Sequence, residues 1–187
     1  MSDFLQEYYR DSGLSRAEME ELYALHAPRE VEKGEELLRI GHKNNAYWIV
    51  ERGLLRSFVF SPEGEDITTG FMARSEIALD FTGFILAKSS IEGIEVLSSG
   101  QIWEVQKSDF QDFKHQSSAI GKWGRNWMDC HLIARQEFHI SHHTLTAKDR
   151  YDALRSTRPR VNQLAPLKYI ASYIGVTDST LSRLRKN

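Results

Sequence analysis

Residues 170–187 read IASYIGVTDSTLSRLRKN, a pattern typical of two short helices joined by a tight turn. Gly175 stands where the turn would fall, and glycine adopts the left-handed backbone of such a turn most easily. Ala171 is small enough to let the second helix approach the first, and Thr177 is a good N-cap for that second helix. The apolar positions that would pack inward are Ile170, Ile174, Val176, Leu181 and Leu184. This arrangement predicts a helix–turn–helix unit.

The second helix of this unit would expose a polar face, because its period of about 3.6 residues turns Leu181 and Leu184 inward. In helix–turn–helix proteins this helix enters the major groove of DNA with its N-terminal half nearest the bases. Arg183 can donate a pair of hydrogen bonds to guanine, and Asp178 can accept one from cytosine. We therefore predict base contacts by Asp178, Ser179 and Arg183, and phosphate contacts by Thr177, Ser182 and Lys186.

The charge of the chain is unevenly distributed. Residues 144–187 hold nine Lys and Arg against three Asp, a net charge of +6, whereas the whole chain carries −2 and the rest therefore carries −8. A basic terminal segment on an acidic body predicts contact with a polyanion, although chance alone can also charge a short segment. One recognition helix reads few base pairs, so we expect a homodimer on a palindromic DNA operator.

The central residues 30–106 change to short runs rich in β-branched and aromatic residues. These runs are AYWIVE, LLRSFVF, DITTGFM, IEGIEVL and GQIWEVQ, and the turn signals between them include ERG at 51–53 and SSG at 98–100. Many short strands at regular spacing predict an antiparallel barrel or jelly roll. The stretch IALDFTGFILAKSS, residues 77–90, interrupts this pattern as a short helix or a functional loop.

A helical segment is expected before the strands, over residues 2–27. Ser15 followed three residues later by Glu18 has the pattern of a capping box, which marks the start of a helix. Leu22 belongs to the apolar stripe that follows, and Pro28 helps to end the helix.

A long helix is expected over residues 108–143, with Ser108 as its N-cap. Its apolar residues fall three or four positions apart, which suits packing on the strand domain or pairing with a second helix. Gly121 and Gly124 weaken a helix interior, so the helix either breaks there or approaches a neighbour closely. We predict dimerisation through this helix, with contacts by Ile120, Trp123, Trp127, Ala134 and Phe138.

Together these elements predict an α+β fold in three parts. Residues 1–107 would form an N-terminal helix and a jelly-roll or β-roll sensor-like domain, and residues 108–143 the dimerisation helix. Residues 144–187 would form a small winged-helix-like helix–turn–helix domain that lacks a C-terminal wing.

The order of these parts resembles the Crp/Fnr family of bacterial transcription regulators, the group of the cyclic-AMP receptor protein. The strongest stretches are VEKGEELLRIGHKNNAYWIVERGLLRSFVF at 31–60, similar to the family's first β-roll hairpins, and PLKYIASYIGVTDSTLSRLRKN at 166–187. The second stretch is similar to a short-tailed branch common in Bacteroidetes, in which the chain ends at or just after the recognition helix. The resemblance implies a cytoplasmic, homodimeric transcription regulator with a cyclic-nucleotide-binding-like domain, and DNA and RNA polymerase as its partners.

The segment that corresponds to the family's cyclic-nucleotide site departs from the family pattern. Family members that bind these ligands carry a Gly-Glu pair for the ribose hydroxyl and an Arg-Ser or Arg-Thr pair for the cyclic phosphate. Here Leu79-Asp80 and Ser89-Ser90 stand near those positions, and residues 75–96 include no arginine. We therefore predict that cyclic AMP is not the effector. The predicted pocket, for another small molecule or for none, is lined by Phe71, Leu79, Asp80, Ser89 and Ser90.

Other kinds of site find little support. His139 and His143 lie four residues apart on a predicted helix, but a third metal ligand is not evident, so we predict no metal site. Cys130 is alone, which excludes a disulfide framework. No spacing typical of a catalytic nucleophile and no Gly-rich phosphate loop occurs, so no enzyme is expected. No apolar run reaches the roughly 18 residues of a membrane span, and the acidic N-terminus lacks a signal-peptide pattern, so we expect no membrane contact.

An alternative function belongs to another class of protein. In it, the β-roll binds an effector and the helix–turn–helix serves protein–protein contacts rather than DNA. Salt distinguishes the two, because DNA binding through Lys and Arg displaces counterions and weakens steeply as salt is added.

Overall fold

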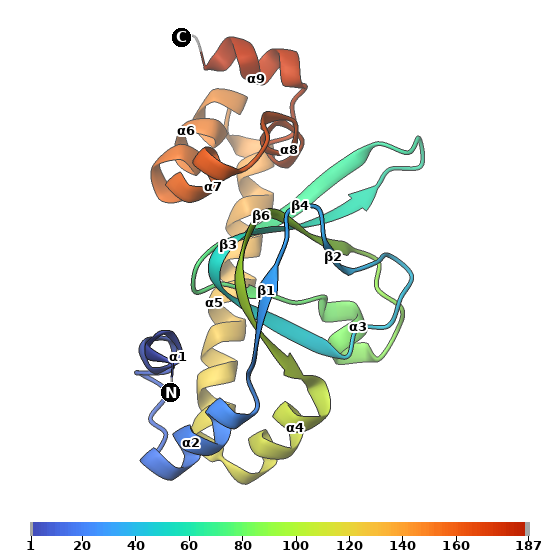
Figure 1. The fold of residues 1–187 in the computed structure, drawn as a ribbon. Coiled ribbons are helices and arrows are strands. Elements are labelled where there is room, and N and C mark those ends of the chain that lie inside the picture. The colour runs from blue at the N-terminus through green and yellow to red at the C-terminus, as the bar shows by residue number, and fades with distance from the viewer. Residues whose placement is uncertain (1, 186–187) are drawn as a thin grey trace.

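The computed structural model describes residues 2–185, which form a β-roll with helices before and after it (Figure 1). The helices are α1 (Asp3–Tyr8), α2 (Arg16–Ala24), α3 (Phe81–Leu86), α4 (Lys107–Gln116), α5 (Ser118–Thr144), α6 (Ala147–Thr157), α7 (Pro159–Leu164), α8 (Leu167–Tyr173) and α9 (Asp178–Leu184). The strands are β1 (Ala27–Val31), β2 (Glu36–Leu38), β3 (Ala46–Phe60), β4 (Asp66–Met72), β5 (Ile77–Ala78) and β6 (Gly93–Gln106). The predicted α+β fold is confirmed.

The strands pair in the order β1-β6-β3-β4, with β2 also on β6 and β5 also on β3, and every pair is antiparallel. Side chains alternate across a strand, so on β3 Tyr47 and Ile49 point to one face of the sheet and Trp48 and Val50 to the other. The first pair packs with residues of α1, α2, α4 and α5, whereas the second lies inside the roll. Because both faces are covered, β3 reads as a nearly continuous apolar run.

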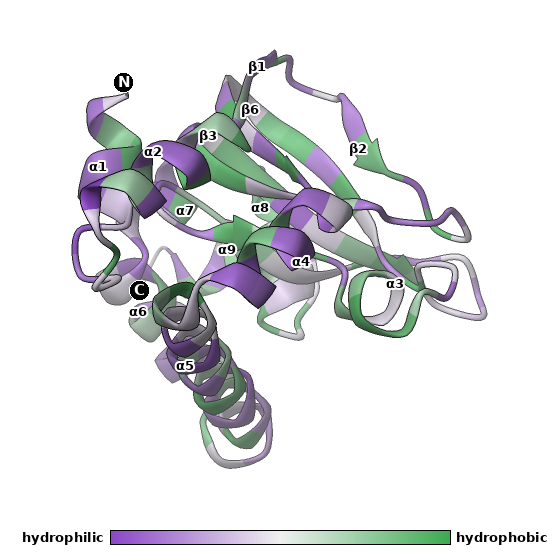
Figure 2. Ribbon diagram, turned by 90° about the horizontal axis from the view of Figure 1, so that it is seen from below, coloured by the Kyte–Doolittle hydropathy of each residue, from purple (hydrophilic) through white to green (hydrophobic). Residues whose placement is uncertain are grey.

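A third apolar cluster joins the roll to the C-terminal helices. Leu54, Phe71 and Leu97 come from the strands, and they pack in one cluster with buried residues of α6, α7, α8 and α9. In Figure 1 these four helices lie together at one end of α5. Figure 2 looks nearly along α5 and shows hydrophobic and hydrophilic residues mixed along its length. The C-terminal helices are therefore packed against the roll, and α5 runs past both.

Two predicted turns are instead irregular points inside long strands, so the prediction of turns at ERG and SSG was wrong. Gly53 has a φ of +99° in the middle of β3, where the pairing with β6 shifts in register. A Cβ on Gly100, in β6, would lie 2.1 Å from the main-chain oxygen of Arg52. The glycines allow the two strands to approach closely and stay paired, rather than ending them.

The long helical region breaks at Ser117, not at Gly121 or Gly124. Ser117 has an extended backbone, its hydroxyl accepts from the Ile120 N–H, and it donates to Glu18 Oε1 at 2.7 Å. It is therefore the N-cap of α5. The prediction of Ser108 as a cap was also wrong, because that residue lies inside α4. Among residues 2–185 no helix, α5 included, is long and apolar enough to cross a membrane.

The N-terminal segment forms two helices rather than one. The predicted capping box is present at the start of α2, where Ser15 and Glu18 exchange hydrogen bonds through their side chains and main-chain N–H groups. Gly13, with a φ of +73°, lies in the connection that separates α1 from α2. Helix α2 ends at Ala24, and Pro28 lies in strand β1 instead of at the helix end.

Candidate nucleic-acid interface and neighbouring cavity

Helices α8 and α9 meet at the turn predicted from the sequence. Gly175 has a φ of +73°, a backbone conformation in which a residue with a side chain would be strained. The N–H of Val176 donates to the carbonyl oxygen of Ala171 at 2.9 Å, a bond typical of a Schellman helix end. Thr177 Oγ1 accepts from the N–H of Thr180 at 3.3 Å and caps α9. Local chemistry therefore fixes the angle between the two helices.

The last carbonyl groups of α8 are held by side chains from two other helices. On α5, His142 Nε2 lies 3.2 Å from the carbonyl oxygen of Tyr173, and its Nδ1 lies 3.1 Å from that of Phe138. Arg150 of α6 donates to the carbonyl oxygen of Ile174 at 2.9 Å. The turn is thus bonded directly to the end of the long helix.

Helix α9 turns a polar face outward. Leu181 is fully buried on its inner side. The exposed positions are Thr177, Asp178, Ser179, Ser182 and Arg183. The Arg183 Nε lies 3.4 Å from the carbonyl oxygen of Ser179, so the guanidinium lies along the helix surface. Lys186, the sixth predicted contact, lies outside the described residues. Figure 1 places α9 at the extremity of the molecule.

The residues predicted to contact a second subunit lie on the side of α5 that faces its own chain. Those residues are Ile120, Trp123, Trp127, Ala134 and Phe138. Ile120 is fully buried, and the Trp123 ring packs edge-on against Tyr8 with centroids 5.6 Å apart. Trp127 stacks on Phe81 at 6.1 Å, and the remaining two line a cavity beside the roll. Ile120 is therefore covered by its own chain, whereas Ala134 is exposed, and partner contacts by the other four residues stay a prediction.

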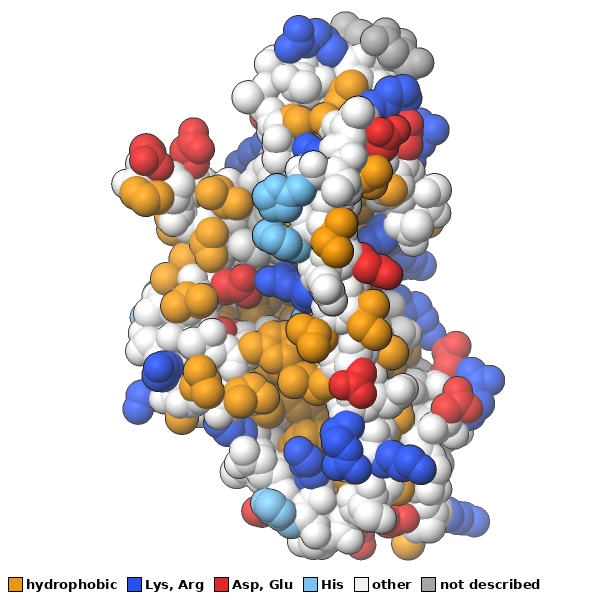
Figure 3. All heavy atoms as spheres, turned by 180° about the vertical axis from the view of Figure 1, so that it is seen from behind, with side chains coloured by type: hydrophobic (Ala, Val, Ile, Leu, Met, Phe, Trp, Pro, Cys, Tyr) orange, Lys and Arg blue, Asp and Glu red, His pale blue; other side chains and the backbone are white. Residues whose placement is uncertain are grey.

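The opposite side of α5 carries a second apolar stripe, which the protein's own chain leaves exposed (Figure 3). Met128 is 39% exposed, Leu132 68%, Ile133 55% and Ile140 48%. Ile85 and Leu86 at the end of α3 are more than half exposed as well. Helix α5 therefore has apolar residues on two sides, and its own protomer covers one of them.

His139 and His143 also lie on the exposed side of α5. Their ring centroids are 4.8 Å apart with the planes at 73°. Within residues 2–185 of one chain, no three His, Cys, Asp or Glu side chains are placed to hold a metal ion together.

Two of the predicted effector-pocket residues serve the fold, and a third is exposed. Asp80 is buried as the N-cap of α3, where its carboxylate accepts from the N–H groups of Thr82 and Gly83. Ser90 is buried, and its hydroxyl donates to the carbonyl oxygen of Glu92 at 2.6 Å. Ser89 is exposed on a short bridge of the chain. These residues lie outside the cavity, which Phe71 and Leu79 do line.

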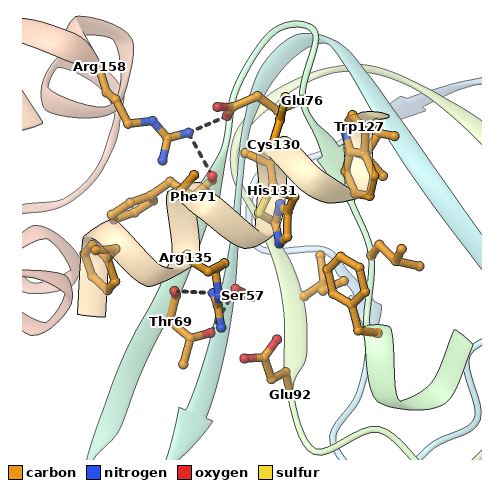
Figure 4. A pocket seen from close by; sticks show the side chains of 18 of the residues that line it. Ser57, Thr69, Phe71, Glu76, Glu92, Trp127, Cys130, His131, Arg135 and Arg158 are labelled. Atoms are coloured by element: carbon orange, nitrogen blue, oxygen red, sulfur yellow. Dashed lines mark hydrogen bonds and ion pairs between the residues drawn. The ribbon is translucent and has the colours of Figure 1, made fainter. Parts of the chain in front are cut away.

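A cavity of about 350 Å³ lies between the roll, α5 and the C-terminal helices (Figure 4). Aromatic rings line part of it, and His131 of α5 lies between Phe81 and Trp127, with centroids 4.8 Å and 5.2 Å away. Polar side chains converge on the rest. Arg135 of α5 donates to the carbonyl oxygen of Thr69 at 3.2 Å.

The cavity holds charged groups of both signs. Arg158 donates to the carbonyl oxygen of Phe71 at 2.9 Å and pairs with the carboxylate of Glu76. Burial raises the pKa of Glu92, and the positive charge of Arg135 opposes this effect. Burial lowers the pKa of His131, and Arg135 lowers it further. Such a site offers stacking, a guanidinium and a carboxyl group to a small polar ligand.

No family model and no curated protein matches the sequence. Solved structures do match the fold. A transcriptional regulator assigned to the Crp/Fnr family from Eubacterium rectale is 14% identical with a TM-score of 0.73, over 96% of this chain and 86% of that one. FixK2 from Bradyrhizobium japonicum is 16% identical with a TM-score of 0.72, over 86% and 83% of the two chains. CLP from Xanthomonas campestris, described as a regulator responsive to c-di-GMP, is 15% identical with a TM-score of 0.69, over 92% and 90%.

The chain has the Crp/Fnr fold. Within it, the helix–turn–helix part of this chain packs on strand β4. The hydroxyl of Ser172 on α8 accepts the N–H of Thr68 at 2.9 Å and lies 3.3 Å from the carbonyl oxygen of Asp66. Across the same contact, the Phe71 ring packs against Tyr173 with centroids 5.1 Å apart. The helix–turn–helix part is therefore bonded directly to the roll.

Sequence reasoning missed the cavity residues that come from outside the strands. These residues are His131 and Arg135 of α5, Arg158 before α7 and Tyr173 of α8. The spacing of Trp127, His131 and Arg135 along one helix face was a usable signal, because residues four apart share a face. Arg158 and Tyr173 carried no such signal, since they reach the cavity only through the docking of the C-terminal helices.

Proposed function

We propose that this protein is a sequence-specific DNA-binding transcription regulator of the Crp/Fnr type that acts as a homodimer. The observation that carries the proposal is the exposed polar face of α9 at the extremity of a basic C-terminal part. Arg183 and Asp178 on that face have the hydrogen-bonding groups that read bases in a major groove. Thr177 and Ser182 flank them as phosphate contacts.

A second copy of this chain is the proposed occupant of the exposed side of α5. Helix α9 has seven residues and a length of about 10 Å, so one protomer reads only a short stretch of DNA. To read two half-sites, both α9 helices of a dimer must reach the same side of the DNA duplex. The stripe of Met128, Leu132, Ile133 and Ile140 supplies an apolar surface for that pairing.

The cavity between the roll, α5 and α8 is the proposed site of a small-molecule effector. Its walls belong to all three parts, so a bound molecule would bias the position of α9. Cyclic AMP remains unsuited to it on our proposal, because Glu76 and Glu92 place negative charge beside Arg158 and Arg135. RNA polymerase is the proposed further partner, and no catalytic role is proposed.

Selection of bound sites from a random DNA pool tests the function. The expected product is a palindrome, because two symmetric recognition helices read symmetric half-sites. Binding to that site and to random duplex is then measured over a range of salt concentrations, where a steep loss of affinity marks phosphate contacts. If no sequence is enriched and binding does not depend on salt, the helix–turn–helix serves protein contacts and the proposal is wrong.

A further inference from the structure

Two adjacent histidines on the free side of α5 have no role within their own chain. The rings of His139 and His143 are 4.8 Å apart and exposed, and neither takes part in a hydrogen bond or an ion pair among residues 2–185. Histidines four residues apart on a helix project from one face and can share one metal ion. Imidazole nitrogen is a good ligand for zinc, copper and nickel.

The other histidines of α5 are occupied. The ring nitrogens of His142 lie 3.1 Å and 3.2 Å from the carbonyl oxygens of Phe138 and Tyr173, to one of which a neutral ring donates its N–H, and the ring lies against Phe138 at 4.4 Å. His131 is stacked in the cavity wall. The free pair is therefore distinct from the histidines that hold the fold together.

The free pair lies in line with Met128 and Leu132 of the exposed stripe of α5. The exposed residues at successive spacings of three or four along this line are Arg125, Met128, Leu132, Gln136, His139 and His143. This spacing is close to the 11-residue pattern of about 3.67 residues per turn, which keeps one face of a nearly straight helix in line. A partner that covers Leu132 therefore also meets the two histidines.

The direction of the partner helix follows from the DNA. Helix α5 has 27 residues and is about 40 Å long, so antiparallel copies would place the two α9 helices at opposite ends of the dimer. Both α9 helices reach one duplex only if the two α5 helices run parallel about a two-fold axis. Each residue of the stripe then faces its own counterpart, and four imidazoles converge near that axis.

We propose that His139 and His143 of both subunits form a zinc site across the dimer axis, which rests on the dimer of the proposed function. Four nitrogen ligands meet the tetrahedral preference of Zn²⁺, and two ligands from one chain leave the site incomplete. The site lies one residue before the end of α5 at Thr144, where the C-terminal helices begin. Bound zinc therefore holds the two α5 helices together next to the C-terminal helices, and so fixes the distance between the two recognition helices.

Zinc binding and dimerisation are measured together on the full chain. After chelator treatment, the protein is titrated with Zn²⁺, and bound metal is counted against subunits. The expected result is one ion per two chains, with a dimer dissociation constant lowered at least about tenfold, because zinc binds the dimer and not the monomer. Co²⁺ in place of zinc should give the intense visible absorption of a tetrahedral site.

Matched variants assign the ligands. His139→Ala with His143→Ala should remove the metal and its effect on dimerisation. His115→Ala, which removes an exposed histidine on α4, should change neither. The proposal is overturned if the double variant binds zinc as the native chain does, or if zinc binds one per chain without strengthening the dimer.

The two proposals fail in different ways. A chelated protein that still dimerises and binds its operator, but takes up no zinc, removes the metal site alone. A protein that neither dimerises nor binds DNA, with or without added zinc, contradicts the proposed function.

Discussion

The guanidinium carbon of Arg56 on β3 lies 3.6 Å from the ring centroid of Tyr169 on α8. Arg56 is 1% exposed, and it donates to both carboxylate oxygens of Asp66 and to Glu95, each at 2.6 Å. A buried cation thus neutralises two carboxylates of the roll and supports a ring of the helix–turn–helix part. Cation–π contacts of this kind contribute about 0.5–2 kcal/mol. The packing of the candidate DNA-binding part on the roll depends on this cluster.

Replacing Arg56 by Met should destabilise the protein strongly. The change leaves Asp66 and Glu95 facing each other without their cation, and removing one partner of a buried pair costs about 3–5 kcal/mol. The lower end is expected, since the Asp66 side chain is 34% exposed. Urea unfolding measures the free energy. Arg52→Met, on the same strand but paired at the surface with Glu30, should cost less than about 1 kcal/mol. Equal losses for the two variants would contradict the role of Arg56.

Replacing Arg183 by Ala should weaken binding to the selected operator and relax its sequence at one symmetric position. A bidentate contact to guanine contributes about 1–3 kcal/mol of discrimination, which corresponds to roughly 5- to 150-fold in affinity. Affinities for the operator and for its single-base variants are measured by fluorescence anisotropy. Arg160→Ala removes the same charge beside the roll, and it should leave the base preference unchanged. A preference that survives Arg183→Ala would show that other residues read the bases.

Replacing Leu132 by Glu should separate the subunits. Leu132 is 68% exposed at the centre of the free stripe of α5, so the variant should fold as a monomer. In the dimer a buried, unpaired carboxylate should raise the dissociation constant at least about 100-fold. Sedimentation equilibrium reports the change. Ile40→Glu makes the same kind of substitution at an exposed site outside α5 and should leave the dimer intact. An unchanged dimer in Leu132→Glu would place the interface elsewhere.

Acid should destabilise the protein through His26. Burial lowers the pKa of His26 to about 4, although the hydrogen bond between Nδ1 and the carbonyl oxygen of Leu22, at 2.7 Å, opposes this shift. The hydroxyl of Tyr9 lies 3.0 Å from Nε2. The unfolded chain binds the proton near pH 6.5, and the folded chain does so only near pH 4. Stability is therefore fully present above pH 6.5 and is lost as the pH falls toward 4, by about 3 kcal/mol.

Urea unfolding between pH 7 and pH 4.5 tests this sign. His26→Gln should make the dependence on pH shallower, and His131 should leave a remainder, because burial lowers its pKa as well. Glu18 adds to the slope only below about pH 5, because hydrogen bonds from Ser15 and Ser117 lower its pKa to about 2 in the folded chain, whereas the unfolded chain takes up the proton near pH 4.5. If His26→Gln keeps the full pH dependence of the free energy of unfolding, His26 is not the source of the loss in acid.

Cyclic AMP should not bind at micromolar concentrations. Residues 75–96 supply no arginine to the cavity, and Arg158 already pairs with the carboxylate of Glu76. Isothermal calorimetry on the DNA-competent protein measures the binding. A dissociation constant in the micromolar range or tighter would show that Arg135, which reaches the cavity from α5, suffices to hold a cyclic phosphate.

The sequence alone determined the features that depend on a few neighbouring residues. The glycine of the α8–α9 turn, the cap at Thr177 and the capping box at Ser15 were predicted from residue type and spacing, because each bond spans only a few positions of the chain. The strands and the long helix followed from periodicity. Glycines in the long strands were misread as turns, since a turn and a strand irregularity use the same residue.

Only the tertiary structure decided which side of α5 is free and what lines the cavity. Ile120 and Leu132 are equally apolar in the sequence, yet one is fully buried and the other is 68% exposed. A helix with apolar residues on two sides does not reveal which side its own chain will cover. Arg158 meets Glu76 only because the C-terminal helices dock on β4, and Arg135 meets Glu92 because α5 packs beside the roll. Contacts of this kind join residues far apart in the chain, so no local pattern specifies them.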